Sequence, residues 1–359
     1  MKKYCLFLFC FSLILVFSVL PACGGKSVSF TDPYLEELVR DAIDKPQGII
    51  YPWELEEITI LDGNMEEIEG LEGSAGMIMD LSGLEYCINL IILDLSNNQI
   101  VDLIPLESLV SLNTLQLSGN QINDLTPLTS LSILETLALS GNQIYDISPL
   151  DSLSNLRSLD LSLNSIKDIS ILSKLTYLGE LNLAQNQIND ISPLSSLDVL
   201  ETLVLARNEI WDITPLASCI GLKTLALGHI PPSGRWFRSE DVPGTSNQVH
   251  DLTPLASLIG LEELNLNANE VTDLNPLSEL NNLKNLYLST NLISDISPLG
   301  AMENLEILDL RSNEISDLSP LLGCTGLKDL SVMSGNPLST KSIEEIIEEL
   351  RDRDVYIMR

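Results

Sequence analysis

The side chains best suited to chemistry are few, and most of them lie in or beside one short stretch of the chain. There are only two histidines, His229 and His250, and three tryptophans among 359 residues. The stretch "GHIPPSGRWFRSEDVPGTSN" (228–247) contains an aromatic pair between two arginines. These four residues are Arg235, Trp236, Phe237 and Arg238. Imidazole can transfer protons or bind metal ions, whereas Trp and Arg dominate protein-binding hot spots.

No pattern around these residues supports catalysis. The chain has no GxSxG, HExxH or GxxxxGK motif, so the usual nucleophile, zinc and phosphate sites are missing. His229 and His250 could join Asp251 or Glu240 around a metal ion, but their spacing is not that of metal ligands. We therefore predict a binding protein that is not an enzyme, with no catalytic residues, no cofactor and no metal site.

A repeat of 22 residues determines where these side chains must lie. "LSGNQINDLTPL" (117–128) returns as "LSGNQIYDISPL" (139–150) and as "LAQNQINDISPL" (183–194). Twelve units follow the pattern LxxLxLxxNxIxDIsPLxxL. The units begin at Ile68, Leu90, Leu112, Leu134, Leu156, Leu178, Leu200, Leu222, Leu261, Leu283, Leu305 and Leu327. Because strand side chains alternate, the two leucines of LxL point to the same face and the residues beside them face outward.

The unit resembles the bacterial leucine-rich repeats of the internalin type, over Ile68 to about Leu338. The resemblance implies an α/β solenoid in which a curved parallel β-sheet forms the concave face and short 3₁₀ or turn segments form the convex face. Repeats of this kind usually bind proteins, so the resemblance also implies protein binding. A column of asparagines, from Asn98 to Asn313, should end each strand and bond to backbone groups of neighbouring turns.

The repeat frame brings the chemically distinctive residues together. The eighth unit has 17 extra residues before its asparagine, Asn247, so the insertion must leave the end of a strand near the rim of the concave face. Arg207 and Trp211 lie one repeat before His229 and His250, at equivalent positions. The predicted partner-binding residues are Arg207, Trp211, His229, Arg235, Trp236, Phe237, Arg238, His250 and, in the outward column of the concave strands, Tyr287. The alternative is an inserted loop that folds back over the convex edge.

A second column carries aspartate, from Asp80 to Asp317. A ladder of carboxylates could bind calcium weakly, but the clustering of a tight calcium loop is missing. We predict instead that each aspartate accepts backbone N–H bonds in its own turn. The step that follows, such as Ser148-Pro149-Leu150, is interpreted as an N-cap with Pro at the first helical position.

The first residues of the chain predict export. Two lysines precede an apolar run (4–20) that is typical of a secretory signal. "LPAC" (20–23) resembles the lipobox of bacterial lipoproteins, which implies cleavage before Cys23, palmitate on that cysteine and a lipid-anchored place outside the cytoplasm in the cell envelope. An uncleaved anchor and ordinary secretion are the alternatives. Three later cysteines share one repeat position and are predicted to be buried without disulfides: Cys87, Cys219 and Cys324.

These features divide the chain into a signal peptide (1–22), a tether (23–29), an N-terminal cap (30–67), the repeats (68–338) and a C-terminal cap (339–359). Caps are needed because a bare terminal repeat would expose its core. For the first cap we expect a strand at 55–60 and a helix with Asp32 as N-cap, whose apolar face is Leu35, Leu38, Val39 and Ala42. For the second cap we expect a strand at 355–358 and a helix with a Ser342–Glu345 capping box, whose apolar stripe is Ile343, Ile346, Ile347 and Leu350.

Charge limits the class of partner. The formal net charge of −32 argues against nucleic acid, because phosphate binding requires a basic face, and against docking of the protein body on anionic lipid. We expect a monomer that contacts the membrane only through its N-terminal lipid and binds a protein with a basic surface, as a receptor, adhesin or scaffold. The alternative is a carbohydrate or cell-wall binding module that uses the Trp-bearing loop.

Overall fold

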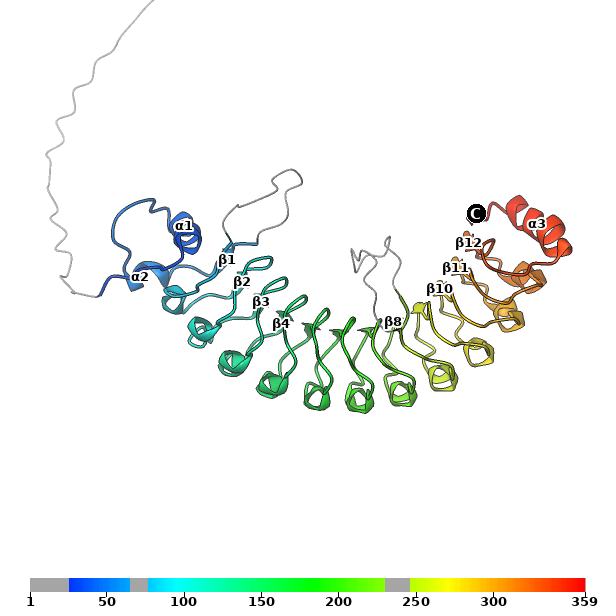
Figure 1. Ribbon diagram of the computed structural model, residues 1–359, viewed down its shortest axis with the longest axis horizontal. Coiled ribbons are helices and arrows are strands. Elements are labelled where there is room, and N and C mark those ends of the chain that lie inside the picture. Colours follow the sequence, from blue (N-terminus) through cyan, green and yellow to red (C-terminus); the bar gives the residue numbers. More distant parts are fainter. Residues whose placement is uncertain (1–25, 65–76, 230–245, 359) are drawn as a thin grey trace, which may run out of the picture.

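The chain forms a curved solenoid with one continuous parallel sheet along its inner side (Figure 1). The computed structural model describes residues 26–64, 77–229 and 246–358. Thirteen strands pair in chain order. They are β1 (Ile60–Asp62), β2 (Ile92–Asp94), β3 (Thr114–Gln116), β4 (Thr136–Ala138), β5 (Ser158–Asp160), β6 (Glu180–Asn182), β7 (Thr202–Val204), β8 (Thr224–Ala226), β9 (Glu263–Asn265), β10 (Asn285–Tyr287), β11 (Ile307–Asp309), β12 (Asp329–Ser331) and β13 (Tyr356–Met358).

The strands stack because each contributes the same leucines to one core. Leu93, Leu115 and Leu137 lie opposite one another in the register of β2, β3 and β4, and each is at most 1% exposed. Leu117, two residues after Leu115, is also fully buried, as expected for side chains that alternate along a strand. The predicted solenoid with a concave parallel sheet is therefore confirmed.

The asparagine column joins neighbouring coils by hydrogen bonds. Asn120 is typical: its Oδ1 accepts the Ile100 N–H at 2.9 Å, and its Nδ2 donates to the carbonyls of Leu95 and Leu117 at 3.0 and 2.9 Å. Two of these three groups belong to the preceding coil. A buried amide thus satisfies backbone groups that the turn would otherwise leave without partners. The predicted role of the column is confirmed, and it extends to Asn336 in the last unit.

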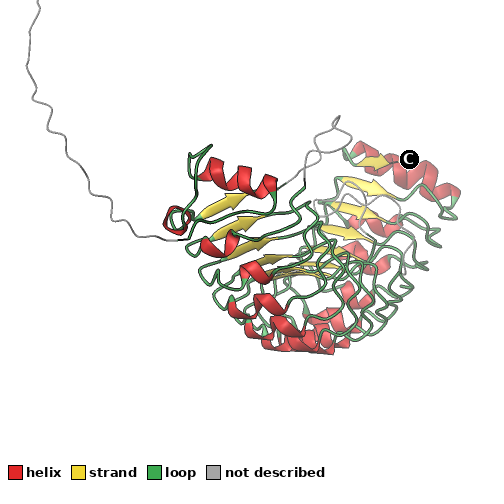
Figure 2. Cartoon of the chain, turned by 60° about the vertical axis from the view of Figure 1, so that its left-hand side comes forward, coloured by secondary structure: helices red, strands yellow, loops and turns green. Residues whose placement is uncertain are grey.

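The convex side consists of short 3₁₀ helices (Figure 2). They are η1 (Leu84–Tyr86), η2 (Ile104–Leu106), η3 (Thr126–Ser130), η4 (Ser148–Ser152), η5 (Ser170–Lys174), η6 (Ser192–Ser196), η7 (Thr214–Ser218), η8 (Thr253–Ser257), η9 (Asn275–Leu277), η10 (Ser297–Ala301) and η11 (Ser319–Gly323). The predicted N-cap position is wrong by one residue, because Ser148 is the first residue of η4 and Ile147 precedes it as the cap.

The aspartate column takes over the capping role. Oδ1 of Asp146 accepts the Ser148 N–H at 2.8 Å, so the aspartate caps the helix and Ser148 is its first residue. All eleven aspartates of the column make the same bond to the residue two places later. A bond from the Thr126 hydroxyl holds the pKa of Asp124 below its usual value. The predicted structural role of these carboxylates is confirmed.

The array begins earlier than the repeat pattern indicates. β1 pairs directly with β2, Leu61 opposite Leu93, so the first strand is Ile60–Asp62 and not a strand of the unit predicted to start at Ile68. The expected early strand at 55–60 is also displaced, because Leu55 ends the helix α2 (Pro52–Leu55). The first nine residues of the unit predicted from Ile68 lie outside the described residues, which resume at position 77.

One carboxylate both caps the first helix and bonds the N-terminal cap to the array. Asp32 caps α1 (Pro33–Ala42), as predicted: its Oδ1 accepts the N–H groups of Tyr34 and Leu35 at 2.9 and 3.1 Å. Its Oδ2 accepts the Met79 N–H of the first coil at 2.8 Å, and Asp32 is only 6% exposed. Leu35, Leu38 and Val39 pack against the core as expected, whereas Ala42, at the last turn, is exposed.

Replacing Asp32 with alanine should lower the free energy of unfolding of the cap by about 2–3 kcal/mol, because four backbone donors, one of them at 3.4 Å, lose their acceptor. Hydrogen exchange at the α1 amides, combined with urea unfolding, measures this loss. Asp41→Ala is the matched control, because Asp41 lies in the same helix and is exposed. Equal exchange rates in the two variants would contradict the assigned role of Asp32.

The C-terminal cap also differs in detail from its prediction. A π-helical turn, η12 (Ser342–Ile346), leads into α3 (Ile347–Asp352), and β13 then extends the sheet as expected. Ser342 makes no capping box. It is fully buried, donates to the Ser316 carbonyl at 2.9 Å and accepts the Leu318 N–H at 3.1 Å. Ser339 takes the cap position by accepting the Ser342 N–H, and Ile343, predicted to be apolar and inward, is 43% exposed.

The three later cysteines are buried and free, as predicted. Burial raises the pKa of Cys87 to about 12 and that of Cys219 to about 11, so both stay protonated at neutral pH. Within the described residues, no helix has the length and apolar character needed to cross a membrane.

Candidate functional site

The concave face is acidic and carries little steric bulk at its centre. The thirteen strands contain seven carboxylates and no lysine or arginine. The carboxylates are Asp62, Asp94, Asp160, Glu180, Glu263, Asp309 and Asp329. Near the middle of the sheet the outward residues are small, and Val204 and Ala226 pack with Ala184 and Ala206 into an apolar floor. A partner could therefore approach the backbone closely at this point and would meet negative charge on both sides.

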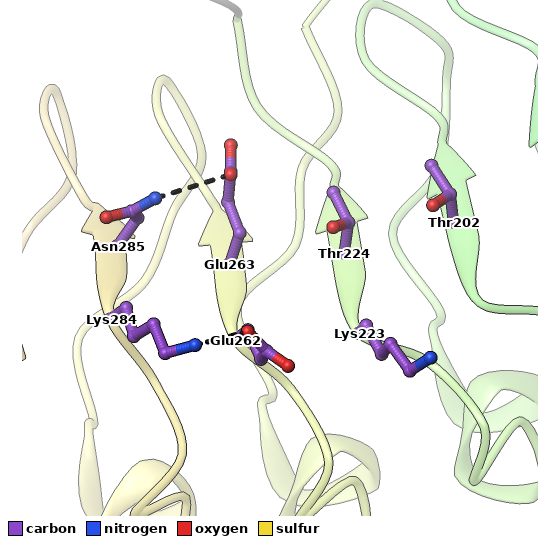
Figure 3. Close-up of a pocket in the computed structure, with 7 residues that line it drawn as sticks. All are labelled: Thr202, Lys223, Thr224, Glu262, Glu263, Lys284 and Asn285. Atoms are coloured by element: carbon purple, nitrogen blue, oxygen red, sulfur yellow. Dashed lines mark hydrogen bonds and ion pairs between the residues drawn. The ribbon is translucent and has the colours of Figure 1, made fainter. Parts of the chain in front are cut away.

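An open groove of about 280 Å³ lies along strands β7 to β10 at the side where the strands begin (Figure 3). Its lining residues are Thr202, Lys223, Thr224, Glu262, Glu263, Lys284 and Asn285. The lysines are neutralised within the rim, since Lys284 pairs with Glu262 at 2.6 Å and Lys223 with Glu201 at 2.7 Å. Nothing in this groove activates a nucleophile, so its polar lining suits contact with a partner's polar groups.

The structure brings Arg207 and His229 together at the strand ends beyond β7 and β8. Nε and Nη2 of Arg207 lie 3.0 and 2.8 Å from Nδ1 of His229. A guanidinium group only donates, so Nδ1 must accept, and the ring carries its proton on Nε2. Arg207 occupies a left-handed backbone conformation with φ of 56°. The predicted stacking of these two side chains in one column is observed.

Both ends of the insertion are held by the array. His229 N donates to the Asn267 carbonyl at 3.1 Å, and the His229 carbonyl accepts from the side-chain amides of Asn265 and Asn267 at 3.3 and 3.2 Å. At the other end, Asn247 resumes the asparagine column by donating to the Leu205 carbonyl at 2.9 Å. The segment therefore starts and finishes at fixed points on the concave rim.

The remaining predicted residues do not all gather at this point. Trp211 is 59% exposed, and His250, in the same column one repeat later, is exposed with its Nδ1 3.4 Å from the Gln248 carbonyl. Tyr287 lies on β10, two strands beyond β8. The other predicted residues lie outside the described part of the chain: Cys23, Arg235, Trp236, Phe237 and Arg238.

Sequence reasoning missed the pairing of Asp309 with Arg311. It also missed the side-chain amides of Asn265, at the end of β9, and of Asn267, two residues beyond it. Asp309 is 5% exposed and accepts Nε and Nη2 of Arg311 at 2.9 and 2.6 Å, which raises the pKa of Arg311. Burial, together with Glu263 and Asp309, raises the pKa of Tyr287. The doubled asparagine in "ELNLNANE" (263–270), directly after the insertion, was the available signal for the amides that hold His229.

The repeats match a known family. A model of leucine-rich repeats, in two copies, matches residues 88–130, 134–174, 154–196, 259–301 and 303–348. These ranges together span more than half of the chain. No curated protein matches the sequence.

Solved structures give the same assignment. An internalin (inlF) from Listeria monocytogenes is 32% identical, with a TM-score of 0.79 over 92% of this chain and 91% of that one. InlJ from the same species, whose functional domain includes a cysteine ladder, is 21% identical, with a TM-score of 0.70 over 87% of this chain and 62% of that one. The ectodomain of the plant receptor kinase GASSHO1/SCHENGEN3 from Arabidopsis thaliana is 23% identical, with a TM-score of 0.61 over 77% and 33% of the two chains. The chain therefore belongs to the leucine-rich repeat family and is an internalin-like bacterial member of it.

Proposed function

We propose that this protein is a lipoprotein of the bacterial cell envelope that binds a protein partner with a basic surface on its concave face and on the loop 228–247. The observation that carries the proposal is the charge of the inner strands, which hold seven carboxylates and no basic residue. Complementary charge speeds association and excludes acidic competitors. Cys23, in its lipobox-like setting, would supply the lipid anchor.

Two further features support a protein partner. The sheet is continuous over thirteen strands, which at about 4.8 Å per strand gives a surface on the order of 60 Å long. The plant ectodomain with the same fold has been solved in complex with CASPARIAN STRIP INTEGRITY FACTOR 2, so this fold is able to present a bound partner. The candidate contacts beside the acidic strands are Arg207, Trp211, His229 and Tyr287.

Charge reversal on the concave face is the direct test. The triple variant Glu180→Lys, Glu263→Lys, Asp329→Lys should reduce partner capture from envelope extract at least about tenfold, because roughly 1.4 kcal/mol of attraction is lost. The matched control, Glu107→Lys, Glu279→Lys, Glu303→Lys, changes net charge by the same amount at exposed carboxylates outside the strands. Both captures are quantified at low and high salt.

The control separates the concave face from bulk charge. An equal loss in both variants would show that only net charge matters, and an unchanged capture in both would refute the proposed surface. Capture that is insensitive to salt and is abolished by Trp236→Ala would instead favour carbohydrate binding by the loop, because sugar–aromatic contacts do not depend on ionic screening.

A further inference from the structure

The N-terminal cap displays an apolar cluster on its outer surface, formed by Ile49, Tyr51 and Trp53. Ile49 is 58% exposed and Trp53 is 63% exposed. The rings of Tyr51 and Trp53 stack with centroids 6.4 Å apart and an angle of 11° between planes. Large side chains left in water at this density indicate a surface that meets something else.

The cluster is held in place by its polar neighbours. Lys45 Nζ donates to the Ile49 carbonyl at 2.6 Å, pairs with Glu54 at 2.6 Å and lies 5.8 Å from the centre of the Tyr51 ring. The Tyr51 N–H donates to Glu54 Oε2 at 2.8 Å. Glu54 is the only carboxylate in the segment 45–54, and Lys45 neutralises it. Within this segment the exposed large side chains are apolar, while the exposed carboxylates Asp44, Glu56 and Glu57 flank it on either side.

The cluster lies where the chain enters the fold. Val28 forms an antiparallel bridge with Ile50, and its N–H donates to the Ile50 carbonyl at 2.9 Å. Ile50 is the residue between Ile49 and Tyr51. Cys23 precedes Val28 by five residues, which can span at most about 17 Å when fully extended. A lipid on Cys23 would hold this cluster within one bilayer leaflet's thickness of the membrane surface.

We infer that Ile49, Tyr51 and Trp53 lie in the interfacial zone of the bilayer that carries the lipid anchor, which departs from the expectation that the N-terminal lipid is the only membrane contact. This inference rests on the proposed anchoring through Cys23. Trp and Tyr prefer this zone because their rings are apolar while their polar atoms reach water. The tether makes the contact intramolecular, so a weak preference for the interface is enough to hold the cap there.

Membrane contact at the cap would fix the orientation of the solenoid relative to the bilayer. The cap is at one end of the arc and the C-terminal helix α3 is at the other (Figure 1). His229 follows β8, seven strands along the sheet from β1. With the cap on the bilayer, the array would carry the concave face and the root of the insertion away from the lipid, where a partner can reach them.

Tryptophan quenching by lipid tests the inference. The mature chain, which begins at Cys23 and is purified from bacterial membranes, is reconstituted in phosphatidylcholine vesicles with or without bromine on the acyl carbons nearest the headgroup. Bromine should remove about one third of the emission in the natural chain and about half in Trp211→Phe, because one of three or one of two tryptophans meets lipid. In Trp53→Phe the quenching should nearly vanish. Trp211 is the matched control, since it is 59% exposed but lies on the array.

Flotation of the same vesicles separates the two proposals. Protein that floats with the vesicles and loses quenching only in Trp53→Phe supports both the anchor and the cap contact. Protein that floats without quenching, or that is quenched equally in Trp53→Phe, overturns the cap contact and leaves the anchor standing. Protein that does not float overturns the anchor, and with it the cap contact.

Discussion

Asn208→Ala is expected to lower the free energy of unfolding by about 2–4 kcal/mol, because three buried backbone groups lose their partners at once. Asn208 is fully buried. Its Oδ1 accepts the Ile188 N–H at 3.0 Å, and its Nδ2 donates to the carbonyls of Leu183 and Leu205 at 2.9 and 3.0 Å. Two of these groups belong to the preceding coil, so the alanine would weaken the joint between two units as well as one turn.

Urea unfolding followed by circular dichroism gives the change. The control is Asn155→Ala, which removes a single exposed bond from Nδ2 to the Ser132 carbonyl at 2.8 Å and should cost less than about 1 kcal/mol. If Asn208→Ala unfolds at the same urea concentration as Asn155→Ala, the column does not hold the coils together as described.

The second large effect is expected at the root of the insertion. A Cβ on Gly228 would lie 2.1 Å from the Asn267 nitrogen and 2.5 Å from its carbonyl oxygen, both of them backbone atoms that cannot rotate away. Gly228→Ala should therefore cost about 3 kcal/mol or force β8 and β9 apart. The displaced backbone would also break the bond from His229 N to the Asn267 carbonyl, so the Arg207–His229 contact would be lost.

Gly179→Ala is the matched control, because its Cβ would meet only the Arg157 carbonyl oxygen, at 3.8 Å. Thermal unfolding measures the stability of both variants, and the chemical shifts of the His229 ring report the contact with Arg207. A Gly228→Ala protein as stable as Gly179→Ala, with an unchanged His229 spectrum, would contradict the close approach of the two backbones.

Most of the fold could be predicted because every repeat places the same residue types at the same positions of the coil. Leu115 and Leu117 are one copy of a pair that recurs in each unit, so a single misread unit does not alter the core. The aspartate column was predictable for the same reason, since ten of the eleven aspartates, Asp146 among them, stand two residues before the first residue of a 3₁₀ helix. Because many units share one pattern, an ambiguous residue in one unit does not change the predicted structure.

At the two ends of the array the 22-residue repeat is lost, and the sequence no longer predicts the structure as well. The start of the array was misplaced because Leu61 and Leu93 are separated by 32 residues, and only pairing in space shows that they are neighbours. Ser342 looks locally like a helix cap, but its hydroxyl bonds to Ser316 and Leu318, some 25 residues earlier. Long-range contacts of this kind leave no local pattern to read.

In the candidate site, too, the contacts between equivalent repeat positions could be predicted and the other contacts could not. Arg207 and His229 could be paired in advance because they occupy one column in adjacent repeats. The amides of Asn265 and Asn267, which hold the His229 carbonyl, could not, because they act across a segment whose length breaks the frame. The pair of Asp309 with Arg311 was missed since its residues belong to different columns of the unit.

The pairing of β8 with β9 has a consequence for how such a protein can change. Thr224 and Glu263 are direct neighbours in the sheet although 38 residues of chain lie between them. Both ends of the insertion are fastened to the array, because His229 N donates to the Asn267 carbonyl and Asn247 donates to the carbonyls of Leu205 and Leu227, so the coils on either side keep their regular pairing. New sequence could therefore be exchanged at this point, by natural variation or by grafting, and the recognised molecule could change while the solenoid keeps its shape.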